Sequence, residues 1–231
     1  MNVYYNTAKT IIRIFHLIFN QDCHTFGKLD YHRGAKIIAG NHPNATDGLF
    51  LPFIFTEKLH FFVQGDIFDI PFVGWLLAKA DQIKVTPGQK HLALKQGIRL
   101  LENNKAVAIF PEAALNPDGQ SLKSATGAVR MSLYTQVPII PVGFYVPPNY
   151  LRYMVRDKNG RKSRGHWQKR GHCYVHIGEE WLPSMEFTGA ADRATLDELT
   201  ERLMQKIMAQ AQLAMQAYTR ESGLATKLAT I

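Results

Sequence analysis

Residues 39–48 read Ala-Gly-Asn-His-Pro-Asn-Ala-Thr-Asp-Gly. The short β-branched run at residues 35–39 predicts a buried strand, and the apolar run at residues 48–55 predicts the start of a helix. His42 and Asp47 are five positions apart, which would separate them on a helix and place them on opposite faces of a strand. The Pro-Asn pair that follows the histidine is typical of a turn. We therefore expect a turn that brings the imidazole and the carboxylate together at the end of a strand.

Such a His–Asp pair has a specific chemical use. A carboxylate bonded to one imidazole nitrogen fixes the tautomer and leaves the other nitrogen free to accept a proton. The sequence offers this base no nucleophile, because it has no Gly-x-Ser-x-Gly motif and neither Cys23 nor Cys173 lies in a reactive context. The pair would suit an enzyme whose substrate supplies the hydroxyl. The alternative is that Asp47 only caps the following helix and His42 is an ordinary turn residue.

The composition is that of a globular protein with one strongly basic segment. The 231 residues, 46% of them hydrophobic, are enough for one domain. Two distant cysteines fit a reducing compartment better than a disulfide framework. Residues 151–172 contain eight basic residues and one acidic residue and so carry most of the net charge of +8. This segment could meet nucleic acid, anionic lipid or an acidic carrier, or it could be a solvated loop.

Residues 1–21 have the pattern of an amphipathic helix. They contain no run of the roughly 20 apolar residues needed to span a membrane, and no signal-peptide pattern. One predicted face carries Lys9, Arg13, His16 and Asn20, and the other carries Tyr4, Ala8, Ile11, Phe15, Ile18 and Phe19. Such a helix lies in a membrane interface or packs on its own domain. We assign residues 1–21 to this helix and residues 22–231 to the main domain.

The rest of the chain alternates between strand and helix patterns. Short β-rich runs predict strands at residues 60–63, 82–85, 106–110, 137–144 and 173–177. Apolar periodicity predicts helices at residues 89–103, 126–134 and 192–218. The inward faces are expected to carry Leu92, Leu94, Ile98 and Leu101 in the first of these helices and Leu196, Leu199, Leu203 and Ile207 in the last. This alternation predicts a single layered α/β domain.

Residues 23–34 are polar and turn-like. Two other segments leave a choice of interpretation. Residues 67–78 are apolar but broken, and would pack in the core or form a wall for a fatty-acyl chain. The prolines at the ends of residues 137–144 indicate an edge strand or a strand start.

Three short sequence blocks, taken in their order along the chain, form a recognisable pattern. They are Asn41-His42-x4-Asp47, Phe110-Pro111-Glu112, and the Val-Pro-Ile-Ile-Pro-Val run at residues 137–142. A weaker fourth block contains Pro71, Gly74 and residues 82–85. Together the blocks resemble the glycerophosphate and lysophosphatidic-acid acyltransferase superfamily, over about residues 1–145.

The resemblance implies a fold and a reaction. The fold would be α/β, with a mixed, mostly parallel sheet flanked by helices. The reaction would be acyl transfer from an acyl-CoA or acyl-carrier-protein thioester to a hydroxyl of a lysophospholipid, in phospholipid biosynthesis. Neither a metal nor a bound cofactor is implied. A monotopic enzyme at the cytoplasmic face of the membrane is also implied, which agrees with the amphipathic start.

The resemblance also assigns roles to individual residues. His42 would be the general base and Asp47 its orienting partner. Glu112 would shape the acceptor site within the block formed with Phe110 and Pro111, and Asn41 belongs to the same candidate substrate-binding set. A structural role for Glu112, bonding backbone amides at a strand end, is the alternative. The oxyanion formed during acyl transfer needs preorganised donors, which the sequence does not identify.

Two departures from the family pattern concern the acceptor. The family usually has an arginine within three positions after Phe-Pro-Glu, where this chain has Ala-Ala-Leu, and another after the second block, where it has Val-Thr-Pro. Those arginines are associated with the acceptor phosphate, and a bidentate guanidinium is hard to replace. Lys84 and Lys123 are the nearest candidate cations. Lysophosphatidic acid is the default acceptor, and a lysolipid without the phosphate is the alternative.

Two other classes of function compete with an acyltransferase. A lipid-binding relative with reduced catalysis would be expected to lose the His–Asp pair, but both residues are present. A nucleic-acid-binding protein would interleave stacking aromatics with its cations, and the basic segment offers only Tyr153 and Trp167. We therefore expect a lysolipid, an acyl donor and an anionic membrane surface as partners, and no nucleic acid.

Overall fold

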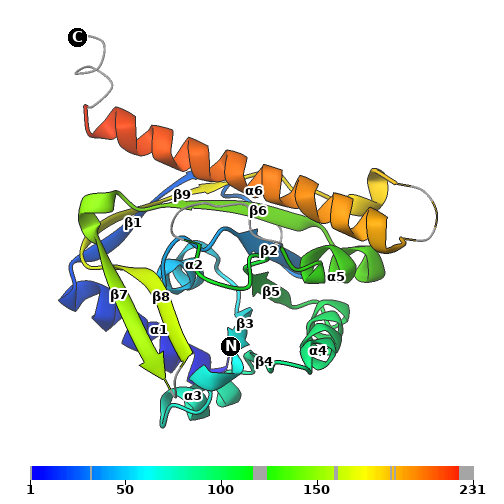
Figure 1. Ribbon diagram of the computed structural model, residues 1–231, viewed down its shortest axis with the longest axis horizontal. Coiled ribbons are helices and arrows are strands. Elements are labelled where there is room, and N and C mark those ends of the chain that lie inside the picture. The colour runs from blue at the N-terminus through cyan, green and yellow to red at the C-terminus, as the bar shows by residue number, and fades with distance from the viewer. Residues whose placement is uncertain are drawn as a thin grey trace.

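The chain forms a seven-stranded sheet in the order β1-β9-β6-β2-β5-β3-β4 and a separate two-stranded sheet, β7-β8 (Figure 1). The computed structural model describes residues 2–31, 33–116, 124–158, 161–187, 189 and 191–223, and of residues 156–158 and 161–164 the backbone alone. The predicted α/β class with a mixed, mostly parallel sheet is confirmed, because every described pair in the large sheet is parallel except β6 with β9.

The strands and helices have the following bounds. The large sheet consists of β1 Gln21–Gly27, β2 Lys36–Gly40, β3 Leu59–Gln64, β4 Ile83–Val85, β5 Ala106–Ile109, β6 Ile139–Tyr145 and β9 Gly171–Ile177. The α-helices are α1 Val3–Ile18, α2 Asp47–Ile54, α3 Val73–Lys79, α4 Lys90–Glu102, α5 Gly127–Thr135 and α6 Arg193–Glu221. Short 3-10 turns occupy Gly65–Ile67, Pro148–Tyr150 and Pro183–Met185.

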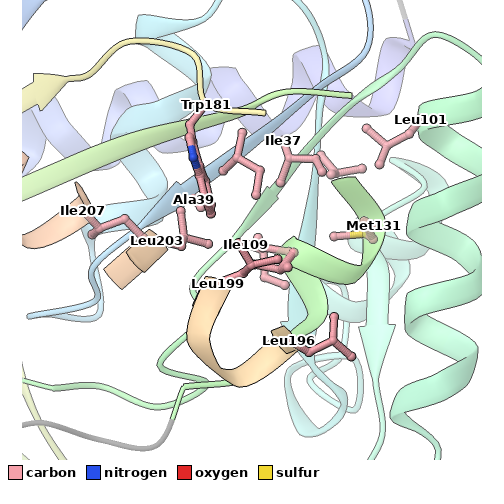
Figure 2. Packing of buried hydrophobic residues seen from close by; sticks show 14 of the residues in the cluster. Ile37, Ala39, Leu101, Ile109, Met131, Trp181, Leu196, Leu199, Leu203 and Ile207 are labelled. Atoms are coloured by element: carbon pink, nitrogen blue, oxygen red, sulfur yellow. The ribbon is translucent and has the colours of Figure 1, made fainter. Parts of the chain in front are cut away.

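Two apolar layers cover the sheet because successive side chains of a strand point to opposite faces. Ile37 and Ala39 of β2 face a layer formed with α4, α5 and α6 (Figure 2). Ile38 faces the other layer, which includes Phe50 of α2. The predicted inward face of the last helix is confirmed, since Leu196, Leu199, Leu203 and Ile207 are all buried.

Helix α6 lies unusually close to β6. A Cβ added at Gly143 would lie 1.9 Å from the backbone nitrogen of Ala211. Only glycine therefore allows the strand and the helix to approach this closely.

Several predictions about individual elements are wrong. Residues 23–34 were expected to be turn-like, yet they contain most of β1. Among the described strands it lies at the edge of the sheet and pairs with β9 alone, so it does not need an apolar run. The prolines of residues 137–144 were expected to mark an edge strand or a strand start. The edge alternative is wrong, because β6 lies between β9 and β2, but the strand-start alternative agrees with Pro138, which directly precedes the first residue of β6. Pro141 is tolerated there because it stands one residue before the ladder with β9, which begins at Val142.

Two apolar positions are also more exposed than predicted. Leu92 is 51% exposed, because α4 packs instead through Ala93, Gly97 and Leu101. In the apolar segment 67–78, which could have been core, Phe72 and Trp75 are 61% and 50% exposed. The core interpretation is therefore wrong for these two aromatic residues.

The first helix is confirmed, but its faces differ from the prediction. His16, expected on the polar outer face, is buried and stacks on Phe50 with ring centroids 4.5 Å apart. Its burial is possible because Nδ1 lies 3.0 Å from Gln21 Oε1. Leu17 and Ile18 are instead 74% and 72% exposed. Helix α1 thus packs on the domain through a narrow face and keeps an apolar surface open, and the domain boundary at residue 21 stays a prediction.

The basic segment contains a hairpin instead of a loop. Strands β7 Leu151–Lys158 and β8 Arg161–Gln168 pair antiparallel along their whole length, from Leu151 opposite Gln168 to Lys158 opposite Arg161. In Figure 1 this hairpin lies with α1 and α3 on the side away from α6.

Candidate active site

The turn between β2 and α2 brings His42 and Asp47 together. Strand β2 ends at Gly40 and helix α2 begins at Asp47. Nδ1 of His42 lies 3.3 Å from Oδ2 of Asp47. The predicted pairing of an imidazole and a carboxylate at the end of a strand is therefore confirmed as geometry.

Asn44 holds the carboxylate in place. Its backbone N–H donates to Oδ2 of Asp47 at 2.8 Å, and its side-chain amide donates to Oδ1. The side-chain oxygen of Asn44 in turn accepts from the backbone N–H of Thr46 at 2.9 Å. All three residues are fully buried. The sequence suggested only a turn role for Asn44. Its hydrogen bonds to the Asp47 carboxylate are shown by the structure alone.

Burial raises the pKa of Asp47, and the bonds to His42 and Asn44 oppose this rise. Because Asp47 faces Nδ1, a neutral His42 carries its proton there and presents Nε2 as the free base. The imidazole ring stacks on Phe110, with centroids 4.2 Å apart and an angle of 13° between the planes. The side chain of His42 is 22% exposed, so its free nitrogen can meet a substrate.

Glu112 lies directly beside this pair. It follows β5, and its Oε2 accepts from the backbone N–H of His42 at 3.4 Å. The backbone N–H of Asn116 donates to the carbonyl of His42 at 2.8 Å. Burial raises the pKa of Glu112, opposed by the bonds from His42 and Asn116 and reinforced by the charge of Asp47. Both ideas about Glu112, structural and site-shaping, agree with this placement.

The raised pKa of Glu112 predicts a pH-dependent stability. The folded protein holds this proton more firmly than the unfolded chain does, so the contribution of Glu112 is lost as pH rises from its ordinary value of 4.5 through the raised pKa. We expect Glu112→Gln, whose amide oxygen can still accept from His42, to melt about 2–4 °C above the parent near pH 8. Thermal melts across pH should show this gain shrinking toward about pH 4. A gain that is the same at every pH would contradict the ionisation argument.

The other predicted site residues are placed differently. Both polar groups of the Asn41 side chain bond the backbone of Phe144, at 3.1 Å and 2.7 Å, and so tie the turn to β6. Pro111 is buried beside Glu112. Lys84 lies on β4, three strands from β2, about 14 Å away at the usual spacing, and it pairs with Asp69 at 3.7 Å. Lys123 lies outside the described residues.

A groove of about 580 Å³ opens next to the His–Asp turn. Its lining includes Asn41, Pro43, Glu112 and Asn116 near the His–Asp turn, and Gln205, Met208, Gln212 and Met215 of α6. These four helix residues follow one another at spacings of three or four, which places them on one stripe. That spacing was the only sequence signal for the groove, and the inward leucines of the same helix obscured it.

The comparison with known families decides the identity. A family model described as Acyltransferase matches residues 24–145, a span that includes the His–Asp turn, Glu112 and β6. The chain belongs to the acyltransferase family.

Curated proteins with acyltransferase names are similar to this chain over part of their length. The 1-acyl-sn-glycerol-3-phosphate acyltransferase of Pseudomonas aeruginosa is 31% identical over 110 residues, 46% of this chain and 42% of that protein. The protein of the same name from Borreliella burgdorferi is 28% identical over 117 residues, 49% of this chain and 47% of that protein. The matched region thus spans about half the length of these curated relatives.

The fold agrees with a solved structure. The crystal structure of the 1-acyl-sn-glycerophosphate (LPA) acyltransferase of Thermotoga maritima matches with a TM-score of 0.63 and 20% identity, over 93% of this chain and 79% of that one. At this identity the likeness shows that the two proteins share a fold.

Proposed function

We propose that this member of the acyltransferase family moves a fatty acyl group from an acyl-CoA or acyl-carrier-protein thioester to the hydroxyl of a lysolipid, with lysophosphatidic acid as the default acceptor. The observation that carries the proposal is the partly exposed imidazole of His42 held by the buried carboxylate of Asp47. Relatives named 1-acyl-sn-glycerol-3-phosphate acyltransferases support the choice of substrates.

In the proposed mechanism, Nε2 of His42 takes the proton of the acceptor hydroxyl as its oxygen attacks the thioester carbonyl. A C–O bond forms, the tetrahedral intermediate collapses, and the C–S bond breaks. The leaving thiolate then takes the proton from His42, which returns the base to its neutral form. Asp47 stabilises the transient imidazolium and keeps its tautomer fixed. The stack on Phe110 holds the ring in its plane.

The groove beside the site supports a lipid substrate. Met208 and Met215 lie along the wall that α6 provides. Unbranched thioether side chains adapt to apolar chains of varied shape. We assign the fatty-acyl chain to this groove, since Glu112 and Pro43, which neighbour the proposed base, line it.

An assay of purified protein tests the function. Labelled acyl-CoA and acyl-carrier protein are each incubated with a panel of lysolipids that differ in headgroup. Formation of the doubly acylated lipid supports the proposal and identifies donor and acceptor. Release of free fatty acid alone, with every acceptor, would contradict it.

The loop after Glu112 predicts a weak preference for a terminal phosphate. Ala113 and Ala114 are exposed where the family usually offers a guanidinium. We expect Ala114→Arg to improve kcat/KM for lysophosphatidic acid selectively, by about 1–3 kcal/mol if charge-assisted bonds form. The measurement compares kcat/KM for lysophosphatidic acid with that for a lysolipid lacking the phosphate, and Ala114→Gln is the uncharged control. A parent enzyme that already selects the phosphate strongly would contradict this expectation.

We further propose that the protein works at the cytoplasmic face of the membrane, with α1 in the interface. Among the described residues, no helix is both long and apolar enough to cross a bilayer. The exposed apolar surface of α1 supports interfacial contact instead. We expect Leu17→Asp with Ile18→Asp to lower co-sedimentation with vesicles while the melting temperature stays within about 2 °C of the parent, because exposed sites contribute little to stability. A large loss of melting temperature would show that this face of α1 belongs to the core.

A further inference from the structure

The β7–β8 hairpin exposes apolar side chains on both of its faces. Tyr153 and Val155 on one face are 52% and 53% exposed, and Met154 and Trp167 on the other are 45% and 40% exposed. A two-stranded hairpin is marginally stable alone in water, and within the described residues β7 and β8 pair with each other but join no larger sheet. The exposed aromatic and apolar surface indicates that the hairpin works against another surface.

The charge of the hairpin indicates what that surface is. Residues 151–172 carry a net charge of +7, and Arg152, Lys169 and Arg170 are exposed near the base. Tyrosine and tryptophan beside lysine and arginine form the combination that settles at the headgroup level of a bilayer. Basic segments of this kind are attracted to anionic lipid. The partner that fits is an anionic membrane surface.

The hairpin also belongs to one side of the molecule with α1. Helices α1 and α3 lie on that side (Figure 1). Leu17 and Ile18 of α1 and Trp75 of α3 are exposed. A chain of buried bonds joins α1 to the base of β8: His16 Nδ1 lies 3.0 Å from Gln21 Oε1, and Gln21 Nε2 donates to the carbonyl of Gln168 at 2.6 Å. The two elements are therefore held together as one unit.

Strand β8 touches both segments of the candidate active site. The carbonyl of His166 accepts from the backbone N–H of Ala45 at 3.0 Å, and His166 forms a parallel bridge with Asn44. Gly165 packs so closely on Leu115 that an added Cβ would lie 2.3 Å from a methyl carbon of that leucine. Asn44 is the residue that holds Asp47, so the hairpin is one contact away from the His–Asp pair.

We propose that the β7–β8 hairpin is a second membrane contact, which docks on anionic lipid and positions the His–Asp turn through β8. Docking fixes the hairpin, and β8 then holds the two segments of the site together, Asn44 and Ala45 through His166 and the loop after Glu112 through the contact of Gly165 with Leu115. Asn44 in turn fixes the carboxylate behind His42. The docking part of the proposal is argued from the surface of the hairpin and does not depend on the proposed function. The coupling to catalysis rests on the proposed acyltransferase function, because it is expressed as a change in turnover.

The docking is tested with vesicles of phosphatidylcholine alone and vesicles that also contain phosphatidylglycerol. The test variant carries Tyr153→Asp and Val155→Asp. The matched control carries Tyr134→Asp and Met185→Asp, which place the same charges on residues that are 68% and 81% exposed elsewhere. We expect the test variant to lose about tenfold or more in partitioning to the anionic vesicles, and the control to stay within about twofold of the parent.

The coupling is tested by turnover with and without the anionic vesicles, using the donor and lysolipid that support activity. Vesicles should raise kcat of the parent and the control but not of the test variant. A second variant, Leu115→Ala, loosens the contact with Gly165 without touching the exposed surface. It should bind vesicles like the parent and melt within about 3 °C of it, yet lose most of the stimulation of kcat.

Each result decides one part of the proposal. Equal partitioning of parent and test variant overturns the docking. If the test variant loses binding to a DNA or RNA fragment but still binds vesicles like the parent, the docking is overturned in favour of a nucleic-acid contact. Full vesicle stimulation in Leu115→Ala overturns the coupling. Absence of turnover with every donor and acceptor removes the proposed function and the coupling with it, while the sedimentation result still decides the docking.

Discussion

His42→Ala is expected to lower acyl transfer by a factor of about 10² or more, which is the scale for losing a general base. The imidazole is the only part of the proposed mechanism that accepts the hydroxyl proton, so neither Asp47 nor Glu112 can replace it. The change leaves the backbone bonds of His42 to Glu112 and Asn116 intact. We therefore expect the effect in kcat, with a fold that circular dichroism finds unchanged.

His91→Ala is the matched control for this experiment, because His91 is an exposed residue of α4. It should retain the parent rate. Turnover of His42→Ala close to that of the parent, in correctly folded protein, would show that His42 is not the base.

Asp47→Asn is expected to lower kcat by a similar factor, about 10² or more. The carboxylate accepts from the Asn44 backbone, the Asn44 amide and His42. An asparagine has one acceptor oxygen, and its NH₂ group would face a donor in one of these places. The imidazole would then carry its proton on the wrong nitrogen or lose its orientation.

Asp197→Asn provides the control for Asp47→Asn, since Asp197 is a surface residue of α6 paired with Arg193. It should change neither kcat nor KM. The decisive comparison is kcat of Asp47→Asn against kcat of the control, each measured on protein with a parent-like near-ultraviolet circular dichroism spectrum. A reduction smaller than about fivefold would leave Asp47 with a structural role only, in holding the turn through Asn44.

The fold could be predicted from the sequence where local pattern and burial agree. The short β-branched run of β2 predicts a buried strand, and the leucine spacing of α6 predicts one buried helix face. Both predictions are confirmed. Strand β1 escaped prediction because a parallel edge strand draws its stability from backbone pairing with β9, and its polar sequence gives no apolar signal. His16 escaped because its burial depends on Gln21 and Phe50, which reach it only through the tertiary fold.

The candidate site was predictable to the extent that it is local. The turn chemistry between His42 and Asp47 sufficed to expect their pairing. Glu112 and Phe110 were found through the order of the blocks, since they come from another strand of the sheet. The groove wall of α6 and the contact of β8 with Asn44 were not predictable, because they join segments far apart in the sequence.

The position of β9 has a consequence for how the chain can be divided. The family match, residues 24–145, contains every recognised motif, yet β9 stands between β6 and β1 in the sheet. A fragment cut after β6 would leave β1 with no strand to pair with and the outer edge of β6 open, which invites aggregation. The half of the sequence that the family model matches is therefore not an autonomous folding unit. During synthesis β1 cannot pair until β9 has been made. Pairing between segments so far apart in the sequence slows folding.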